Sequence, residues 1–576
     1  MAEVAACLDN DTAGPVVRNP RPGDRFVLVK AHGAIGARSL GALAERCLSA
    51  LLIAAIIASI AASFRYGFDR TLDGKLTITG EGQFVSAVCA ILSQKNYGYG
   101  RYVCDGSQKQ QMRDIGLWYD DEALSRIGKT NEQWRSDAVF LDSALDKAFA
   151  LPPAPASGAM AFGWGGDAGY QDFVDFAFRV FGHRIESLYL GFFLLIVVST
   201  ILMCVQFWRN YFALLAVLAF QVGILNYLGL FDALRIGSLS NPRCLSFLAI
   251  TPVFHALFLA VYRVRLDGRA FALFAPQALL IAAAADFRSL AYADVIALTA
   301  CCLVLLLVDL WRQGLPLRQA VRRYWPIYTI FVCVALGVLL PARLADHRIA
   351  AIGGMRYHTF WEPLVYDLQL HPEWKEKYAA QFHNATGDAI AEVAAQSYRE
   401  RHHLLHNKPD FIYGEESRGL TDLAYEKYVR DAYIEFVRND PWFVVQLKYY
   451  NAIQVIDFVG HVMVSQWAAL DWRILALAGL VAFALTMQIR QKTESLRRLT
   501  LCTGLLTLSG ILVALPVWAM VTNVDLLTDL TLINVSASFL LAVWALVCVG
   551  VALSERVRRL VGSRPSTAGV DGPTVR

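Results

Sequence analysis

The chain has 576 residues, of which 56% are hydrophobic and 18% are charged, and its mean hydropathy is +0.41. This composition is typical of membrane proteins and argues against an ordinary soluble enzyme. The net charge of +4 is small and the basic residues are dispersed along the chain, which argues against nucleic acid as a partner.

Long apolar stretches recur along the chain. A membrane-spanning helix needs roughly 20 mostly apolar residues, and it satisfies its own backbone hydrogen bonds within the hydrocarbon. The sequence therefore predicts an all-α polytopic membrane protein with about ten transmembrane helices and two largely helical extracytoplasmic segments. The expected spans are residues 47–64, 186–207, 211–230, 245–262, 271–287, 291–310, 326–344, 472–489, 499–520 and 531–554.

The distribution of Lys and Arg sets the expected orientation. Basic residues gather in alternate connections, which the positive-inside rule assigns to the cytoplasm together with both termini. The Arg-rich and Ala-rich composition favours a bacterial inner membrane. The expected organisation is a cytoplasmic N-terminal segment (1–46), a first transmembrane helix (47–64), a first extracytoplasmic segment (65–185), a six-helix transmembrane region (186–344), a second extracytoplasmic segment (345–471), a three-helix transmembrane region (472–554) and a cytoplasmic tail (555–576).

The first extracytoplasmic segment contains two amphipathic patterns. The stretch FVSAVCAIL carries Phe84, Val88 and Ile91 at helical spacing, and QDFVDFAFRVFG follows the glycine-rich turn GWGGDAGY. Both stretches are expected to form helices at the membrane surface. Cys89 and Cys104 fall in the same segment, where an oxidising compartment would allow a disulfide between them.

The second extracytoplasmic segment is rich in Tyr and Trp, which favour the headgroup region. It begins near RYHTFWEP, and apolar side chains from Tyr425 to Phe436 share one face of an expected helix. Pro441 is expected to begin the next helix, where proline is tolerated. This pattern indicates a small helical layer that rests on the membrane.

Three passages resemble the GT-C class of membrane glycosyltransferases, in particular its family 39-like members. GEGQF at residues 80–84 precedes the first amphipathic helix, FRVFGHRIESLYLGFFLLIVV leads into the second span, and EFVRNDPWFVVQLKYYNAI lies late in the chain. Gly80 stands where the family often has Asp, while Asp69 and Asp73 lie nearer the first span. The resemblance implies transfer of a sugar from a polyprenyl-phosphate donor to a cell-envelope glycan or glycolipid acceptor on the extracytoplasmic face.

The resemblance also implies a carboxylate that removes the proton of the acceptor hydroxyl. Glu81 and Asp167 are the catalytic candidates, and Asp69, Asp73 and Asp172 are candidates for substrate binding. Glu81 has a simpler interpretation as an acid at the first turn of a helix, where the helix dipole favours it. Asp172 has a simpler interpretation on the solvated face of its helix.

The leaving polyprenyl phosphate would need cationic or hydrogen-bonding partners. Arg356 and His358 are candidates for this role, with Trp361 and Glu362 beside them for the sugar. An anchor for lipid headgroups explains the same residues equally well. The sequence has no CxxC pair and no Cys/His cluster with zinc spacing, so no metal site is expected. The sequence identifies no cofactor, and a divalent cation is left as an alternative.

Other functions remain as alternatives. An O-antigen-type polymerase or ligase also uses lipid-linked sugars, but the first external segment here is long for that class. A transporter is disfavoured because the acids within the spans all fall near span ends. A non-enzymatic scaffold for polysaccharide assembly would tolerate replacement of Glu81, Asp167 and Arg356. The acids near the span ends are Asp232, Asp286, Asp294, Asp309 and Asp471.

Overall fold

The structure is a computed structural model, in which the described part of the chain is almost entirely helical. The residues it describes are 45–61, 81–92, 104–118, 121–151, 160–161, 169–230, 245–288, 291–313, 316–344, 361–386, 389–404, 422–468, 493–519 and 524–562, with Leu43 and Phe64. The expected span 472–489 lies outside the described residues, as do Asp69, Asp73, Asp167, Arg356 and His358.

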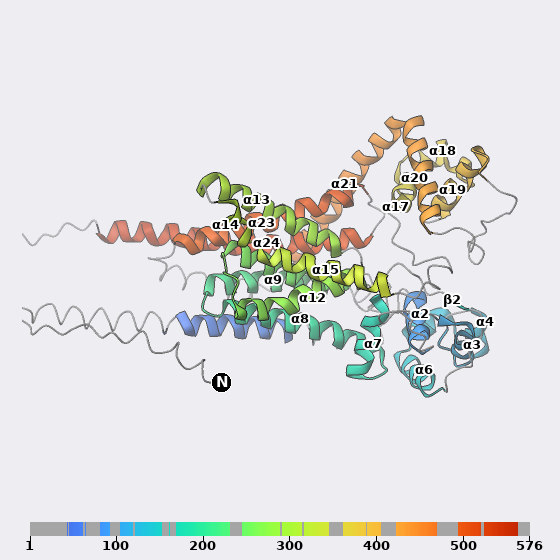
Figure 1. Cartoon of the computed structure of the whole chain (residues 1–576), viewed down its shortest axis with the longest axis horizontal. Helices are drawn as coiled ribbons and strands as arrows, with labels where there is room; N and C mark the ends of the chain where they lie inside the picture. The colour runs from blue at the N-terminus through green and yellow to red at the C-terminus, as the bar shows by residue number, and fades with distance from the viewer. Residues whose placement is uncertain are drawn as a thin grey trace, which may run out of the picture.

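A bundle of apolar helices forms the body of the molecule (Figure 1). Each expected span other than 472–489 coincides with a described helix. The bundle consists of the helix over residues 45–61, α8 (Ile185–Phe207), α9 (Tyr211–Leu230), α11 (Phe247–Val261), α12 (Gly268–Phe287), α13 (Ala291–Gln313), α15 (Trp325–Leu344), α23 (Thr493–Ala519) and α24 (Val524–Gly562), with the short α14 (Leu317–Arg322) between α13 and α15.

Four helical stretches within the described residues are long and apolar enough to cross a membrane, which indicates a membrane protein. Their outward faces expose large apolar side chains, among them Ile296 and Leu307 of α13. Three further apolar stretches, Tyr211–Gly223 of α9, Phe247–Val261 of α11 and Trp325–Gly337 of α15, are 10–17 residues long. The four long stretches are Ile185–Phe207, Gly268–Phe287, Ala291–Trp311 and Ser536–Leu553.

Polar side chains in the bundle interior join neighbouring helices. Ser199 of α8 donates a hydrogen bond of 2.7 Å to Gln277 of α12, and the Gln277 amide nitrogen lies 3.2 Å from Nδ1 of His255 on α11. Gln221 of α9 donates to the hydroxyl of Thr200 at 3.0 Å. Such bonds fix how helices pack where no water competes.

The first lobe is built from short helices on one side of the bundle end. The helix expected around Phe84 is present as α2, but it does not lie at a surface with one polar face, as the sequence predicts. Its side chains described from Phe84 to Ile91 are buried on all sides of the helix, because α2 packs against α3, α7 and β1. The only strands among the described residues, β1 and β2, pair antiparallel over two residues each. The elements are α2 (Glu81–Leu92), β1 (Cys104–Asp105), α3 (Gly106–Asp114), α4 (Asp121–Arg126), α5 (Asn131–Ser136), α6 (Ala138–Ala150) and β2 (Met160–Ala161).

Helix α7 (Gly169–Phe181) joins the first lobe to the bundle. Its apolar face, with Tyr170, Phe173 and Phe178, is buried, and the helix packs against α2, α8 and α12. The expected second amphipathic helix is therefore present. It packs against α8 and α12 of the bundle on one side and against α2 of the first lobe on another.

The second lobe has an aromatic core. Trp374, Tyr378 and Phe382 pack with Phe436 and Phe443, with ring centroids between 4.9 and 6.5 Å apart. Pro441 begins a helix, as the sequence predicts. The elements are α17 (Trp361–Tyr366), η4 (Asp367–Leu370), α18 (Trp374–Lys377), η5 (Ala379–Phe382), α19 (Ala389–Arg401), α20 (Asp422–Asn439) and α21 (Pro441–Ala468).

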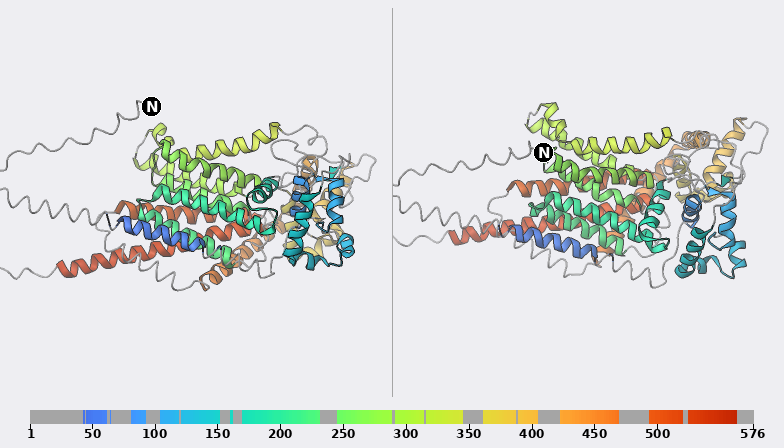
Figure 2. Two further views of the ribbon diagram at one scale, coloured as in Figure 1. Left: turned by 90° about the horizontal axis from the view of Figure 1, so that it is seen from below. Right: turned by 60° about the horizontal axis from the view of Figure 1, so that its bottom comes forward.

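Both lobes lie at the same end of the bundle, although about 200 residues of mostly apolar sequence separate them (Figures 1 and 2). We call this the lobed end. Helix α21 leaves the second lobe and continues along α23 and α24. The start of the helix over residues 45–61 and the end of α24 lie at the opposite end.

Candidate functional site

The structure divides the predicted site residues between the two lobes. Glu81 is the first residue of α2 and Asp172 lies in the first turn of α7, so both belong to helices that pack together. Trp361 and Glu362 begin α17, which packs on α19 and α20 of the second lobe. Trp361 faces the ring of Tyr433, with centroids 6.1 Å apart.

Several predictions about the site stay open. Glu81 is placed by its backbone, but its side chain lies outside the described side chains. Cys89 of α2 is disulfide-bonded, and α2 packs against β1, the strand that begins at Cys104. The pairing of these two cysteines therefore stays a prediction. No group of three or more His, Cys, Asp or Glu residues that could hold a metal is found among the described residues.

The backbone of Gly169, the first residue of α7, packs directly against Asp286 near the end of α12. A Cβ atom built on Gly169 would lie 2.6 Å from the backbone carbon of Asp286 and 2.7 Å from its carbonyl oxygen. Only glycine allows this approach. The contact fixes the N-terminus of α7, two residues after the candidate Asp167, at the lobed end of α12.

A buried carboxylate that the sequence analysis missed lies at the base of the second lobe. Asp367 of η4 is fully buried, and Asn451 of α21 donates a hydrogen bond of 3.2 Å to it. The ammonium of Lys448, one turn earlier on α21, lies 3.9 Å from the same oxygen. The signal available was an acid within the apolar run LVYDLQL, together with a Lys and an Asn at i, i+3 spacing on one helix.

Burial shapes the electrostatics of this cluster. It lowers the pKa of Lys448, while the Asp367 charge acts against that shift. Burial, with a smaller contribution from Asp367, raises the pKa of Tyr433 to about 12. Since Asp367 is fully buried, it cannot touch a large substrate and instead positions α21 and Lys448 against the lobe. The Lys448 side chain is 16% exposed and is the member of the cluster nearest to solvent.

His371 and Phe443 lie beside this cluster. The imidazole of His371 stacks on the ring of Phe443 with centroids 3.8 Å apart, and its Nδ1 accepts a hydrogen bond of 3.1 Å from the Glu373 backbone N–H. Burial lowers the pKa of His371. These contacts hold η4 and the start of α21 together.

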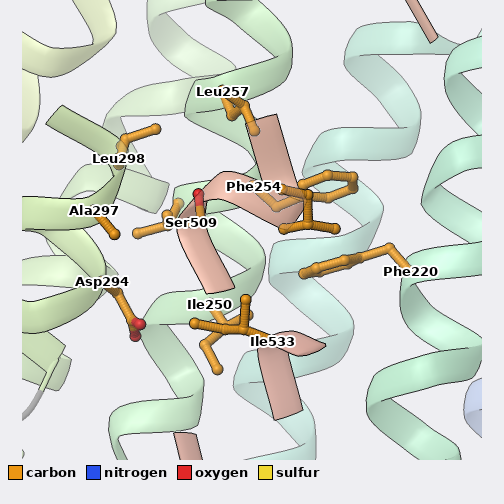
Figure 3. Close-up of a pocket in the computed structure, with 11 residues that line it drawn as sticks. Phe220, Ile250, Phe254, Leu257, Asp294, Ala297, Leu298, Ser509 and Ile533 are labelled. Atoms are coloured by element: carbon orange, nitrogen blue, oxygen red, sulfur yellow. The ribbon is translucent and has the colours of Figure 1, made fainter. Parts of the chain in front are cut away.

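A second buried carboxylate faces a small cavity inside the bundle (Figure 3). Asp294 of α13 is 2% exposed, and its two oxygens have no hydrogen-bond partner among the described residues. The cavity has a volume of about 30 Å³. Its lining comes from α9, α11, α13, α23 and α24 and is almost wholly apolar: Phe220, Ile250, Val253, Phe254, Leu257, Asp294, Ala297, Leu298, Leu506, Ser509 and Ile533.

Comparisons of the chain with models of protein families, with curated proteins and with solved structures gave no match. The fold and the composition define a helical membrane protein with two polar lobes at one end.

Proposed function

We propose that the protein is a membrane glycosyltransferase, which transfers a sugar from a polyprenyl-phosphate donor to a cell-envelope glycan or glycolipid at the lobed end. The observation that carries the proposal is the meeting of both polar lobes at one end of an apolar bundle (Figure 1). A lipid-linked donor has its phosphate and sugar at the membrane surface and its chain in the hydrocarbon. An enzyme for it needs polar groups directly above an apolar body.

The proposal includes a topology of ten spans, with the lobed end outside the cytoplasm and both termini inside, in a bacterial inner membrane. The excess of Lys and Arg in the connections at the opposite end supports this orientation, for example Arg263 and Arg265 between α11 and α12. The coincidence of described helices with the expected spans supports the number.

In the proposed reaction, the acceptor hydroxyl attacks the anomeric carbon while the bond from that carbon to the phosphate oxygen breaks. Glu81 or Asp167 takes the hydroxyl proton. Arg356 and His358 bind the phosphate as its charge develops, and Trp361 and Glu362 bind the sugar. Asp69, Asp73 and Asp172 are the further substrate contacts. Lys448 supplies an additional positive charge at the junction of the second lobe and the bundle.

The test is a glycan and glycolipid profile of a deletion strain that carries wild type, Glu81→Gln or Asp167→Asn, with the membrane level of each variant checked. We expect one sugar to be lost on deletion, restored by wild type and not restored by one of the two variants. Glu122→Gln is the matched control, because Glu122 is an exposed acid of the same lobe that pairs with Arg126. Full restoration by both site variants would reject the proposed catalytic roles, and a profile unchanged by deletion would reject the glycosyltransferase.

An ion-coupled transporter of envelope glycans is the second candidate, and Asp294 is the observation that favours it. A carboxylate buried among apolar helices is characteristic of ion and proton pathways in membranes. Accumulation of the lipid-linked sugar in the deletion strain, without loss of transferase activity in isolated membranes, would favour this candidate.

A further inference from the structure

The carboxylate of Asp294 is buried without a hydrogen-bond partner among the described residues, which is unusual for a buried polar group. Buried polar atoms nearly always have a hydrogen-bond partner, because the loss of water is otherwise not offset. Asp294 is 2% exposed, and within the described part of the chain neither of its oxygens has one. Its side chain points into the cavity between α11, α13, α23 and α24 (Figure 3). A species bound in the cavity would offset the loss of water at this carboxylate.

The size of the cavity limits what the occupant can be. A volume of about 30 Å³ holds one or two water molecules or a bare ion. A sugar, a lipid chain or an organic substrate is far larger. The cavity therefore takes a different class of ligand from the proposed sugar site at the lobes, and the proposal below does not depend on that site.

The polar atoms around the cavity are acceptors. Asp294 presents two carboxylate oxygens, and Ser509 of α23 presents its hydroxyl oxygen. The Ser509 hydroxyl donates its hydrogen to the Leu505 carbonyl oxygen at 3.0 Å. The Cys301 thiol lies 3.1 Å from the Ser509 oxygen and also donates to the Leu505 carbonyl oxygen at 3.4 Å. The hydrogens of both groups are therefore used within this cluster. A site with acceptors and no free donor suits a cation.

We propose that this cavity binds one monovalent cation, a proton or Na⁺, on the carboxylate of Asp294. One positive charge neutralises one carboxylate, and no other lining residue is ionisable. A divalent ion such as Ca²⁺ or Mg²⁺ would keep a net positive charge beside this single carboxylate, in a lining that is otherwise almost wholly apolar. Of the nearby titratable groups, Cys301 of α13 contacts Ser509, and His255 of α11 is bonded to Gln277 of α12 on another side of its helix.

The same helix provides an internal control. Asp309 of α13 is also buried, but its carboxylate pairs with Arg263 at 2.7 Å and with Arg323 at 3.2 Å. It already has its positive charges and needs no ion. A reagent that distinguishes a cation-binding carboxyl from a paired carboxylate should therefore distinguish the two residues.

Dicyclohexylcarbodiimide is such a reagent, because it is apolar and reacts with protonated carboxyl groups. The purified full-length protein, in sodium-free detergent solution at neutral pH, is treated with it and analysed by peptide mass spectrometry. We expect modification of Asp294 to exceed that of Asp309 by about ten-fold. Asp294→Asn should remove the signal at that peptide and leave the low signal at Asp309 unchanged.

Two series identify the cation. If Na⁺ binds, added NaCl but not choline chloride suppresses the modification and raises the melting temperature of wild type, and Asp294→Asn shows no such rise. If the proton is the ligand, NaCl has no effect and the modification falls as the pH is raised. The proposal is overturned if Asp294 is modified no more than Asp309 at every pH and in the absence of Na⁺.

Discussion

The two ends of α13 show how differently a bundle can treat a buried aspartate. At one end, Asp309 accepts ion-pair contacts from Arg263 and Arg323, and the Tyr324 hydroxyl donates to it at 3.4 Å. At the lobed end, Asp294 has no hydrogen-bond partner within the described residues. Burial alone therefore says little about function. The side chains that pair with a buried carboxylate determine whether it joins helices or is available to bind a ligand.

The largest expected effect separates these two residues directly. Asp309→Leu should lower the free energy of unfolding by about 3 kcal/mol, because it leaves two guanidinium groups without their carboxylate in a partly buried place. Asp294→Leu should change it by less than about 1 kcal/mol in sodium-free solution, since it removes a buried polar group that has no protein partner. Denaturant unfolding of both variants in detergent measures the difference.

The comparison would fail if the two variants were destabilised equally. That result would mean that Asp294 has a protein partner as strong as the pair of arginines at the other end. Asp309→Asn serves as a check on packing, because it keeps the shape of the side chain and removes the charge.

A second prediction compares the two ends of α12. Gly169 of α7 lies against Asp286 at the lobed end, whereas nothing lies within 4 Å of a Cβ built on Gly268, the first residue of α12 at the opposite end. Gly169→Ala should destabilise the protein by about 2 kcal/mol, because backbone atoms must move apart. Gly268→Ala should leave stability within about 0.5 kcal/mol or raise it slightly.

The measurement is thermal unfolding of the two variants, together with proteolysis of the first lobe. We expect Gly169→Ala alone to increase cleavage within the lobe, since α7 holds it against the bundle. Equal stability of both variants would show that α7 can shift on α12 at no cost.

The smallest expected effect concerns a third aspartate, whose partners are neutral donors. Asp440 precedes α21 and accepts hydrogen bonds from the Tyr378 hydroxyl at 2.7 Å and from the Phe443 backbone N–H at 3.0 Å. These bonds lower the pKa of Asp440. An acid whose pKa is lower in the folded state stabilises the fold above its unfolded pKa, and this stabilisation is lost as the pH falls through the folded pKa.

Stability of the second lobe should therefore fall below about pH 4, the ordinary pKa of an aspartate. Asp440→Ala should cost about 1 kcal/mol at neutral pH, as for other residues that cap a helix N-terminus, and should reduce this acid dependence. Near-ultraviolet circular dichroism as a function of pH measures it. An unchanged acid dependence in the variant would assign it to other carboxylates.

The sequence predicted the local elements well where apolar periodicity is strong. The helix around Phe84, the helix after the glycine-rich turn and the helix that begins at Pro441 are all present. The second buries one regular apolar face and the third begins with a residue suited to a first turn. The first was wrongly expected at a surface, because its described side chains are buried on all sides of the helix. Of the ten predicted spans, four stretches within the described residues meet the length and hydropathy of a membrane span, and Phe247–Val261 is one of several that are shorter.

The different surroundings of two aspartates on α13 could not be predicted from the sequence. Asp294 and Asp309 look alike in the sequence, as acids near the two ends of one apolar stretch. The long-range partners of Asp309 and the cavity beside Asp294 depend on helices that are distant in the chain. Asp367 was missed because its partners, Lys448 and Asn451, lie about 80 residues away.

The sequence by itself determined that the chain is helical, apolar and divided into a body and two polar segments, because hydropathy and helical periodicity are local properties of the chain. Only the tertiary structure decided that both polar segments meet at one end, that Gly169 contacts Asp286, and that one aspartate of α13 is paired while the other faces a cavity. These features arise from packing between distant helices. Packing depends on the shapes of all the contacting side chains at once, and no single stretch of sequence contains that information.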